Sequence, residues 1–382
     1  MKIAIEAKAV SMRGGGVKTY VVNLIRGLLA SNRADLWLYY DSPSSLGTFH
    51  GAHEEALPLL HKAFLGHWLA RQMAERLRDS RPDVVHYTKA DVPSRLLQPS
   101  IVTIYDVIPL LLPQTQAFGP RFYWPRALAR AARAHHILTI SQTSKDDIVQ
   151  HLGVASSGIT VTRLAPDTTR FHTGISHQVI ADAWHELAIK APYILFVATR
   201  DMRKNAAALV SAFASISDAI PHYLVLAGKA ALKHDNAQEV AARLPVAIRD
   251  KILFIDFVPE ALLPALYAGA DMFVWPSIYE GWAFPVQEAM ACGVPVIVSS
   301  GGALPEVVGE AGIVVPFSTA VLRDRLADEG FEMKLANSMG RLACDSRLKL
   351  SLKQAGLERV KQFSWNSVVQ KTMDVYEKVS SL

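Results

Sequence analysis

Residues 271–299 read DMFVWPSIYEGWAFPVQEAMACGVPVIVS, and this stretch decides the fold of the second half of the chain. Its apolar beginning predicts a short buried strand that ends at Pro276. A loop with Glu280 follows, and Pro285 then suits the first turn of a helix, where the N–H that proline lacks would have no partner. Gly293 ends this helix, and the apolar run after it predicts the next strand. A strand, a helix and a second strand in this order indicate a parallel α/β sheet.

Two glutamates stand eight positions apart in this stretch, Glu280 in the loop and Glu288 in the first turn of the helix. The helix N-terminus between them offers backbone N–H groups and the positive end of the helix dipole, which suit a phosphate. A carboxylate in the loop can accept hydrogen bonds from two sugar hydroxyls, and one on the helix can accept them from a ribose. The plainer interpretation makes Glu280 the start of a helix cap and Glu288 a solvated surface residue.

The whole stretch resembles the E-x7-E signature of retaining glycosyltransferases with the GT-B fold, a group that includes bacterial mannosyl-, glucosyl- and rhamnosyltransferases. The usual wording of the signature is close to EGFGLPxxEAMACGxPVI, and three positions of this chain depart from it. Trp282 and Phe284 are apolar in place of apolar residues, whereas Ala283 replaces a glycine at which the family's backbone approaches the donor closely. The resemblance implies a catalytic Glu280 and the donor-binding residues Gly281, Trp282, Ala283, Phe284 and Glu288.

Length and composition fit a globular protein with two domains. The chain has 382 residues, of which half are hydrophobic and 20% are charged, and it is too long for one ordinary core. It has no uncharged apolar run of about 18 residues, so we expect no transmembrane helix, and its first residues resemble a strand more than a signal peptide. The two cysteines, Cys292 and Cys344, lack metal-ligand spacing and fit a reducing cytoplasm. The net charge of +5 favours anionic partners such as nucleotide diphosphates or a membrane surface, and we expect no nucleic-acid partner.

Strand and helix patterns alternate along the chain and predict two Rossmann-like, doubly wound parallel-sheet domains of the α/β class. The first domain is expected at residues 1–172 and the second at residues 185–364, and the last helix, within residues 365–382, resembles a family helix that crosses back to the first domain. The two domains are expected to face each other across a cleft at the carboxyl ends of their strands, which is the GT-B arrangement. We expect strands at residues 3–5, 36–40, 84–86, 101–104, 137–140, 193–198, 223–227, 252–255, 271–275, 294–298 and 313–315, and helices at residues 17–30, 65–78, 123–134, 144–152, 206–216, 259–268, 305–308 and 365–379.

Three consecutive glycines, Gly14, Gly15 and Gly16, follow the first expected strand. Glycine tolerates positive φ and lets a ligand approach the backbone closely. The simpler interpretation is a flexible turn, because the pattern G-x-G-x-x-G is absent and no acidic residue follows at Rossmann spacing. The resemblance implies that this loop packs beneath the donor diphosphate and lines the acceptor channel.

The segment TRDMRKN, residues 199–205, follows the first strand of the second domain. The resembled family usually has an acidic residue, a proline and then Arg-Lys-Asn at this place. Asp201 matches the acidic residue, and Met202 replaces the proline. Arg203 and Lys204 match directly and are implied to hold the diphosphate, on which negative charge grows as the glycosidic bond breaks. The alternative is a solvated junction between a loop and a helix with two surface bases.

The segment TIYDVIPL, residues 103–110, resembles a His-Asp segment at the end of a family strand. Tyr105 stands where the family has a histidine that contacts the donor sugar. Tyrosine also donates a hydrogen bond but is longer, so the donor preference can differ. Asp106 is retained, and the resemblance implies that it faces the sugar or the acceptor. An equally good interpretation has Asp106 cap a turn before Pro109.

Two stretches have the composition of a helix on a membrane surface. In the first, apolar side chains share one face and basic ones lie elsewhere: Leu65, Trp68, Leu69, Met73 and Leu77 against His67, Arg71 and Arg78. In the second, three arginines cluster on one face behind three aromatic residues: Arg126, Arg130 and Arg133 behind Phe122, Tyr123 and Trp124. The commoner interpretation of both stretches is an ordinary packed helix with a basic, solvated side.

The sequence offers no metal site and no cofactor motif. Its thirteen histidines include no H-E-x-x-H, and no paired C-x-x-C occurs. The pattern Asp-x-Asp, with which other glycosyltransferases bridge a diphosphate to a metal, is also absent. We therefore expect no metal and no cofactor besides the donor substrate.

Over almost the whole chain, the resemblance implies a retaining, metal-independent hexosyltransferase. GDP-mannose is the first expectation for the donor, and the acceptor is expected to be a saccharide or lipid-linked saccharide of an envelope polysaccharide. Without a strong catalytic base, front-face attack is favoured, in which the departing β-phosphate oxygen takes the acceptor proton. No sequence feature decides between this route and a covalent intermediate. The alternatives are a sugar-nucleotide epimerase of the same fold and a non-catalytic sugar-nucleotide-binding protein. We expect a cytoplasmic protein, peripheral at the inner face of the plasma membrane if its basic helices meet lipid.

Overall fold

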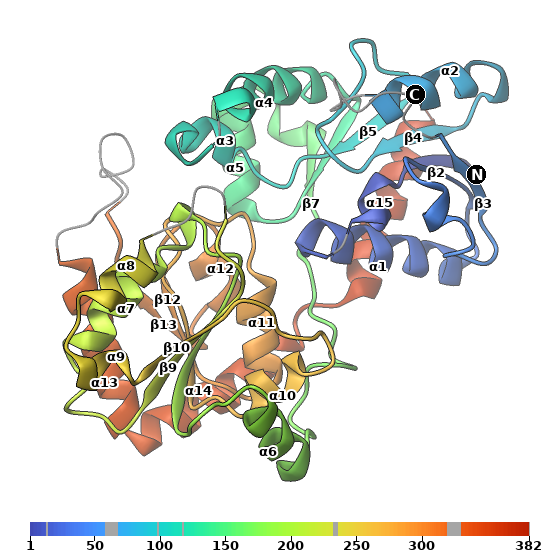
Figure 1. Cartoon of the computed structure of the whole chain (residues 1–382). Coiled ribbons are helices and arrows are strands. Elements are labelled where there is room, and N and C mark those ends of the chain that lie inside the picture. The colour runs from blue at the N-terminus through green and yellow to red at the C-terminus, as the bar shows by residue number, and fades with distance from the viewer. Residues whose placement is uncertain are drawn as a thin grey trace. The chain divides into compact units, whose positions relative to one another are not determined.

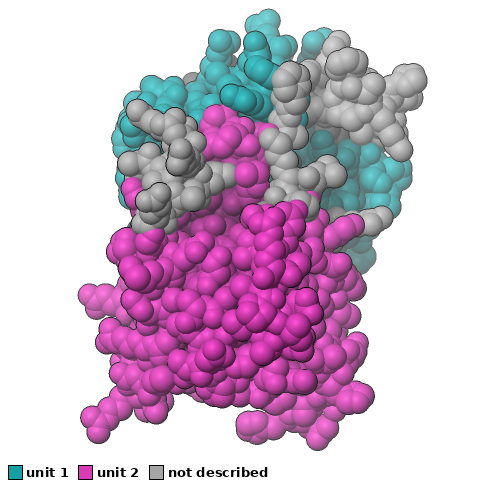
Figure 2. All heavy atoms as spheres, turned by 60° about the vertical axis from the view of Figure 1, so that its left-hand side comes forward, with its two compact units in different colours: residues 1–110, 118–164, 364–382 teal, residues 111–117, 165–363 magenta. Residues whose placement is uncertain are grey.

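The computed structural model describes residues 1–12, 14–57, 68–97, 99–116, 118–231, 236–318 and 330–381. The chain divides into two compact units, each built on one parallel sheet (Figure 1). Unit 1 comprises residues 1–110, 118–164 and 364–382, and unit 2 comprises residues 111–117 and 165–363 (Figure 2). The sequence-based boundaries lie at residues 172, 185 and 365.

Unit 1 contains seven parallel strands in the order β3-β2-β1-β4-β5-β6-β7. The strands are β1 (Lys2–Glu6), β2 (Asp35–Tyr40), β3 (His53–Ala56), β4 (Val84–Tyr87), β5 (Ser100–Thr103), β6 (His136–Thr139) and β7 (Ile159–Val161). Every residue of β4, β5 and β6 is buried, because helices and connections cover both faces of such a sheet. The strand order changes direction between β1 and β4, and doubly wound sheets bind ligands at the carboxyl ends of the strands beside such a switch point.

The helices of the first unit are α1 (Gly16–Ser31), α2 (Trp68–Ser80), α4 (Phe118–Ala131), α5 (Gln142–Leu152) and the C-terminal α15 (Trp365–Ser380), and α3 (Ile108–Leu111) spans a unit boundary. Helix α15 packs on α1, where Gly27 leaves room for Val369 because any Cβ at position 27 would overlap that side chain. A buried imidazole also joins α15 to the sheet, since His86 on β4 bonds the hydroxyls of Tyr376 (2.7 Å) and Thr103 (2.8 Å). Burial lowers the pKa of His86 to about 3, so the ring is neutral at physiological pH.

The connection from β4 to β5 differs from the other crossovers that flank it. Its described residues, within 88–99, contain no helix. The crossovers before and after it carry α2 and α4, and both move across the sheet in the same direction. Because such crossovers are right-handed, α2 and α4 cover the same face of the sheet. The extended connection therefore runs over this face between two helices (Figure 1).

Unit 2 contains six parallel strands in the order β10-β9-β8-β11-β12-β13. The strands are β8 (Tyr193–Val197), β9 (Tyr223–Ala227), β10 (Ile252–Ile255), β11 (Met272–Trp275), β12 (Val296–Ser299) and β13 (Gly312–Val315). The helices are α6 (His177–Glu186), α7 (Ala206–Ala214), α8 (Ala237–Ala242), α9 (Val246–Arg249), α10 (Leu263–Ala268), α11 (Phe284–Ala291), α12 (Leu304–Val308), α13 (Phe331–Cys344) and α14 (Ser346–Val360). The switch point of this sheet lies between β8 and β11, which are hydrogen-bonded neighbours.

Residues 271–299 form a strand, a loop, a helix and a second strand, as the sequence predicts. Pro285 is the second residue of α11, and Gly293 follows the helix with φ +73°, a conformation that favours glycine. Two expected helix starts need correction: α10 begins at residue 263 instead of 259, and α4 begins at residue 118 instead of 123. The expected start at residue 65 lies outside the described residues, which enter α2 at residue 68.

Within the described residues, no helix combines the length and the hydropathy that crossing a bilayer requires.

Candidate functional site

Two loops at the carboxyl ends of adjacent strands, β8 and β11, form the candidate site in unit 2. The first loop ends in a short 3-10 turn, η5 (Met202–Lys204). This turn begins at Asp201 because its carboxylate accepts the backbone N–H groups of Arg203 (2.9 Å) and Lys204 (3.1 Å). The carbonyl oxygen of Arg203 accepts the N–H of Ile278 in the second loop at 2.8 Å. These bonds fix the two loops to each other and orient the two basic side chains.

Glu280 lies between the two cations in the interior of the site. Nη1 of Arg203 lies 2.5 Å from its Oε2, and Nζ of Lys204 lies 2.6 Å from its Oε1. The indole N–H of Trp275, the last residue of β11, donates to the same Oε1 at 3.2 Å. The Lys204 ammonium also lies 4.6 Å from the centre of that indole ring. The carboxylate side chain is 6% exposed and the Arg203 and Lys204 side chains 18% and 14%, so water screens these charges little.

The pKa values of this cluster follow from burial and mutual charge. Burial would raise the pKa of Glu280, but the charges of Arg203 and Lys204 outweigh it and lower that pKa to about 2. Burial and the neighbouring Arg203 lower the pKa of Lys204, whereas Glu280 acts in the opposite direction. The cluster thus places two basic groups beside the ionised Glu280 carboxylate, and the Asp201 carboxylate lies 3.9 Å from Arg203. A guanidinium and an ammonium group held side by side suit an anionic ligand that takes the place of a carboxylate.

A pair of glycines after β12 supports the loop that carries Glu280, and the sequence analysis did not single them out. The backbone of Gly302 pairs with that of Glu280, and Ala303 N–H donates to the Glu280 carbonyl oxygen at 2.8 Å. Gly302 has φ +62°, and a Cβ there would overlap the Glu280 carbonyl oxygen. A Cβ on Gly301 would likewise overlap the carbonyl oxygen of Ile278. Only glycine therefore lets these two loops lie this close.

Residues 281–284 lead from this loop into α11. Gly281, Trp282 and Ala283 are buried, and Phe284, the first residue of the helix, is partly exposed. The indole N–H of Trp282 donates to Gln287 Oε1 at 3.0 Å, and its ring meets Phe363 edge-on at 5.5 Å. Ala283 has φ −139°, which any residue adopts, so the alanine requires no unusual backbone. The Trp282 side chain thus packs into unit 2 and supports the start of α11.

Glu288 is the fifth residue of α11, so it begins the second turn of the helix instead of lying in the first. It is partly buried, and burial raises its pKa to about 7. Tyr267 and Arg170 lower this pKa and Asp167 raises it, and each of these three effects is smaller than that of burial. A carboxyl with this pKa changes charge near neutral pH. A ligand that donates hydrogen bonds to the carboxylate stabilises its charged form.

The other candidate residues lie in unit 1. Tyr105 and Asp106 follow β5 and line a pocket of about 260 Å³, together with Val17, Lys89 and Trp124. The Tyr105 hydroxyl donates to the carbonyl oxygen of Thr88 at 2.9 Å. Asp106 Oδ1 accepts the N–H of Ile108 at 3.0 Å, which is the turn-capping bond that the sequence left as an alternative. Asp106 therefore has a structural role in addition to its place in the pocket wall.

The three glycines lead directly into α1 in the same unit. Gly15 is the N-cap of α1 with φ +101°, a conformation that L side chains rarely adopt, and Gly16 is the first helical residue. Gly14, Gly15 and Gly16 are exposed, and a Cβ on Gly14 or Gly15 would meet no described atom within 4 Å. Val17, the next residue, lines the pocket beside Tyr105. The structure thus brings the glycine loop to the edge of this pocket.

The structure adds Glu6 to the candidate residues. It ends β1 and is 4% exposed. Its Oε2 accepts the Thr88 hydroxyl (3.0 Å), and its Oε1 accepts the N–H of Lys8 (3.1 Å). Burial raises the pKa of Glu6. A sequence signal was available, because an acidic residue at the end of the first strand of a parallel sheet lies at the edge where ligands bind.

Direct contact thus joins Glu280, Arg203 and Lys204 in unit 2, with Glu288 on the helix that follows their loop. Tyr105, Asp106 and the three glycines border one pocket in unit 1. Among the described residues, no group of three or more His, Cys, Asp or Glu side chains could hold a metal ion.

Two family descriptions match the chain over separate stretches. Residues 191–328 match "Glycosyl transferases group 1", and residues 14–170 match "Glycosyltransferase Family 4". These stretches contain every candidate residue named above except Glu6.

Similar proteins extend over the whole chain. The O-antigen chain mannosyltransferase B of Escherichia coli is 28% identical over 398 residues, which cover 99% of this chain and 100% of that protein. Sucrose-phosphate synthase of Thermosynechococcus elongatus has a similar structure, with a TM-score of 0.76, 20% identity and coverage of 100% of this chain and 99% of that one. The Anabaena protein HepE, in complex with UDP and glucose, has a TM-score of 0.74 and 18% identity, and all of both chains is covered. At these identities the two structures establish the fold alone.

Proposed function

Because this chain belongs to the glycosyltransferases of the GT-B fold, we propose that it moves a hexose from a nucleotide diphosphate sugar to a saccharide or lipid-linked saccharide. We propose further that the anomeric configuration is retained and that no metal takes part. The observation that carries this proposal is the buried cluster of Arg203 and Lys204 around Glu280. Two basic side chains in the loop at the carboxyl end of β8, beside the loop that follows the adjacent strand β11, form a site for the diphosphate of a donor.

The cations act on the leaving group. When the bond between C1 of the hexose and the β-phosphate oxygen breaks, negative charge grows on the diphosphate. Arg203 presents a planar fork and Lys204 a compact charge, and both are held in place before the reaction by the turn at Asp201. Their burial strengthens each contact with the phosphate oxygens. This stabilisation grows in the transition state and therefore accelerates the transfer.

Proton transfer follows front-face attack in this proposal. The acceptor hydroxyl forms its bond to C1 on the face that the diphosphate leaves, and the departing β-phosphate oxygen takes the hydroxyl proton. Glu280 is ionised, with a pKa of about 2, so it accepts hydrogen bonds from the hexose hydroxyls instead of supplying a proton. This role requires that the diphosphate, when the donor binds, first replaces the Glu280 carboxylate at Arg203 and Lys204, so that the released carboxylate turns to the sugar.

Glu288 is proposed to bind the ribose of the donor. Two vicinal hydroxyls can donate to one carboxylate, and such bonds favour its charged form. The pKa of Glu288, about 7 without ligand, should therefore fall when the donor binds. The start of α11, with Gly281, Trp282, Ala283 and Phe284, is proposed to border the same donor.

The unit 1 pocket is proposed to bind the acceptor and to contact the donor sugar. Tyr105 and Asp106 line it, and Gly14, Gly15 and Gly16 border it through Val17. Exposed backbone in the glycine loop allows a sugar to lie against the chain. The Tyr105 hydroxyl can accept a hydrogen bond while it donates to Thr88.

We propose GDP-mannose as the donor and an envelope polysaccharide as the product. The O-antigen chain mannosyltransferase B of Escherichia coli, similar over its whole length, supports mannose and this pathway class. The HepE structure contains UDP and glucose, which supports the nucleotide-sugar class but favours another base and sugar. We propose that the reaction takes place on the cytoplasmic side.

A thermal-shift panel of GDP-, UDP-, ADP- and dTDP-sugars tests the donor, and turnover of the stabilising donor with NMR of the product tests the reaction. We expect one donor class to raise the melting temperature of the protein. We also expect its hexose to be released or transferred with the same anomeric configuration that it has in the donor. An isomerised donor without transfer would indicate an epimerase of the same fold. Stabilisation without any turnover would indicate a non-catalytic binding protein, and either result would overturn the proposal.

A further inference from the structure

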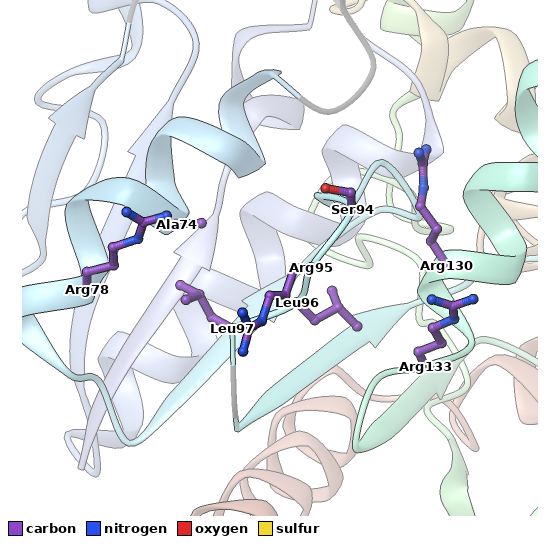
Figure 3. Close-up of a pocket in the computed structure, with 8 residues that line it drawn as sticks. All are labelled: Ala74, Arg78, Ser94, Arg95, Leu96, Leu97, Arg130 and Arg133. Carbon is purple, nitrogen blue, oxygen red and sulfur yellow. The ribbon is translucent and has the colours of Figure 1, made fainter.

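Unit 1 contains a second cavity, of about 580 Å³, that shares no lining residue with the pocket beside Tyr105. It is lined chiefly by four arginines and two leucines: Arg78, Arg95, Arg130, Arg133, Leu96 and Leu97 (Figure 3). These residues come from α2, from the β4–β5 connection and from the end of α4 and the turn after it. Leu97 precedes β5 and Arg133 precedes β6, so this part of the cavity lies at the amino ends of the strands. Tyr105 and Asp106 follow β5 and lie at the opposite edge.

The cavity exists because the connection from β4 to β5 contains no helix in its described part. Helices α2 and α4 cover the same face of the sheet, and a helical crossover between them would fill the space above β4 and β5. An extended segment at residues 94–97 runs there instead and forms the floor of the cavity, with the helices at its sides (Figure 3). The hollow is thus part of the topology of unit 1.

The charges around the cavity are unbalanced. None of the described residues that line it is acidic. The guanidinium groups of Arg78, Arg95 and Arg133 make no hydrogen bond or ion pair within the described parts of the chain. Nε of Arg130 is shielded from solvent and has no hydrogen-bond partner there either. Four like charges around one hollow repel one another, and a shielded donor without an acceptor is rare in folded proteins. An anion with several oxygen atoms would reduce the repulsion among the arginines and accept a hydrogen bond from Nε of Arg130.

We propose that this cavity binds the phosphate group of an amphiphile. All four basic residues are arginines, whose planar forks match phosphate oxygens in pairs, and a phosphate has enough oxygens for more than one fork. Leu96 and Leu97 lie on the floor between the arginines and give an apolar part of the ligand a surface to contact. The site is separate from the residues of the proposed transfer reaction and does not depend on that proposal. The phosphate can belong to a membrane lipid or to a dissolved amphiphile, and the experiment separates the two.

The test compares two double variants that each remove two positive charges from the same region. Arg130→Gln with Arg133→Gln changes the cavity, and Arg121→Gln with Arg126→Gln changes exposed arginines of α4 that do not line it. Calorimetry measures binding of monomeric short-chain phosphatidylglycerol and, as a smaller probe, inorganic phosphate. Flotation with phosphatidylglycerol–phosphatidylcholine vesicles measures binding to a membrane surface.

We expect the cavity variant to bind short-chain phosphatidylglycerol at least about tenfold more weakly than the wild type, because charge-assisted hydrogen bonds are lost. The control variant should stay within about threefold of the wild type, as expected when only distant, screened charge is removed. Inorganic phosphate should bind more weakly than the lipid, because it lacks the part that contacts the leucines. Loss of vesicle binding in the cavity variant alone would identify a membrane lipid as the source. Unchanged vesicle binding with loss of the soluble ligand would identify a dissolved amphiphile.

Three results would overturn the proposal: no binding of short-chain phosphatidylglycerol by the wild type, equal losses in both double variants, or no loss in the cavity variant. Thermal unfolding of each variant shows whether it is folded. If the double variant of Arg130 and Arg133 does not fold, Arg78→Gln on α2 replaces it in the binding experiments. Arg78 is an exposed arginine at the other side of the cavity.

Discussion

Nζ of Lys204 lies 2.6 Å from Oε1 of Glu280. The Glu280 carboxylate is therefore bound to the ammonium group that we propose as a ligand of the donor diphosphate. Arg203 meets the other carboxylate oxygen at 2.5 Å. Glu280 therefore serves two purposes in the proposed cycle. It balances part of the charge of Arg203 and Lys204 while the donor is absent, and it becomes available to the sugar when the diphosphate replaces it.

Glu280→Gln should lower transfer by about 10²–10³-fold, the usual loss when one preorganised transition-state contact is removed. It should also destabilise the free protein, because breaking a buried ion pair typically costs roughly 3–5 kcal/mol. A nucleoside diphosphate should then raise the melting temperature of the variant more than that of the wild type, since it supplies the missing anion. Thermal melts with and without the nucleotide measure this difference. An equal or smaller shift in the variant would show that the diphosphate does not bind at these cations.

The same pair determines how stability depends on acid. The pKa of Glu280 is about 2 in the folded protein and near 4.5 in an unfolded chain. Its contribution is therefore complete above pH about 4.5 and is lost as the pH falls toward 2. The Glu280→Gln variant should lose less stability than the wild type over this window, as urea unfolding at several pH values would show.

Glu288 should have the opposite pH dependence. Its pKa is raised from 4.5 to about 7, so the folded state binds more protons than the unfolded state between these values, and stability falls as the pH rises through this range. Glu288→Gln should therefore be more stable than the wild type at pH 8 and similar to it at pH 4. Glu239→Gln, which changes an exposed glutamate on α8, is the matched control, and its stability should differ little from that of the wild type at either pH. A wild-type advantage at pH 8 would contradict the raised pKa.

Gly302→Ala should disrupt the site without replacing a charged residue. Its φ of +62° is unfavourable for alanine, and the new Cβ would overlap the Glu280 carbonyl oxygen. We expect a loss of more than about 1 kcal/mol in unfolding free energy and a loss of donor binding. Gly340→Ala on α13 is the control, because a Cβ there meets no described atom within 4 Å and alanine favours a helix. Normal donor binding by Gly302→Ala would show that the loop is not held by this contact.

The sequence predicts much of unit 2 because its signals are local. Continuous apolar runs mark β8, β9 and β11, and Pro285 and Gly293 mark the ends of α11. The GT-B fold expected from residues 271–299 is confirmed by the two parallel sheets and by the similar structures. The contact between Lys204 and Glu280 could not be read from spacing, because the two residues are 76 positions apart. It depends on β8 and β11 being neighbours in the sheet, which is a property of the topology.

The elements that the sequence analysis missed have weak or misleading patterns. Strand β3 has the sequence HEEA and lies at the edge of the sheet, where it pairs only with β2. Strand β7 has three residues. Neither strand therefore shows an apolar run. Helix α6 lies between residues 152 and 193, a stretch for which the sequence analysis expects neither a strand nor a helix. Helices α13 and α14 follow the last strand, where no further strand marks an alternation. Glu6 was missed although it ends the first strand, because the burial that sets it apart from other acidic residues cannot be read from the sequence.

Activity should survive chelation if the protein alone neutralises the leaving group. Arg203, Lys204 and the start of α11 are proposed to take the role that a divalent cation has in transferases with Asp-x-Asp. We expect transfer after desalting to be the same with and without excess EDTA. Loss of transfer in EDTA that Mg²⁺ or Mn²⁺ restores would contradict the proposed leaving-group chemistry.

Lys204→Ala should weaken binding of a nucleoside diphosphate far more than that of the monophosphate, because only the diphosphate has the β-phosphate that the ammonium is proposed to contact. Loss of one charge-assisted hydrogen bond corresponds to roughly 1.5–3 kcal/mol, which is about 10–150-fold in affinity. Lys229→Ala is the matched control, since Lys229 is an exposed lysine that follows the neighbouring strand β9. It should change both affinities little, and mainly at low salt. Calorimetry with GDP and GMP, or with the base that the donor panel selects, measures the four affinities. If Lys204→Ala weakens both nucleotides equally and slightly, as Lys229→Ala should, then Lys204 does not hold the β-phosphate, and its pairing with Glu280 serves the fold alone.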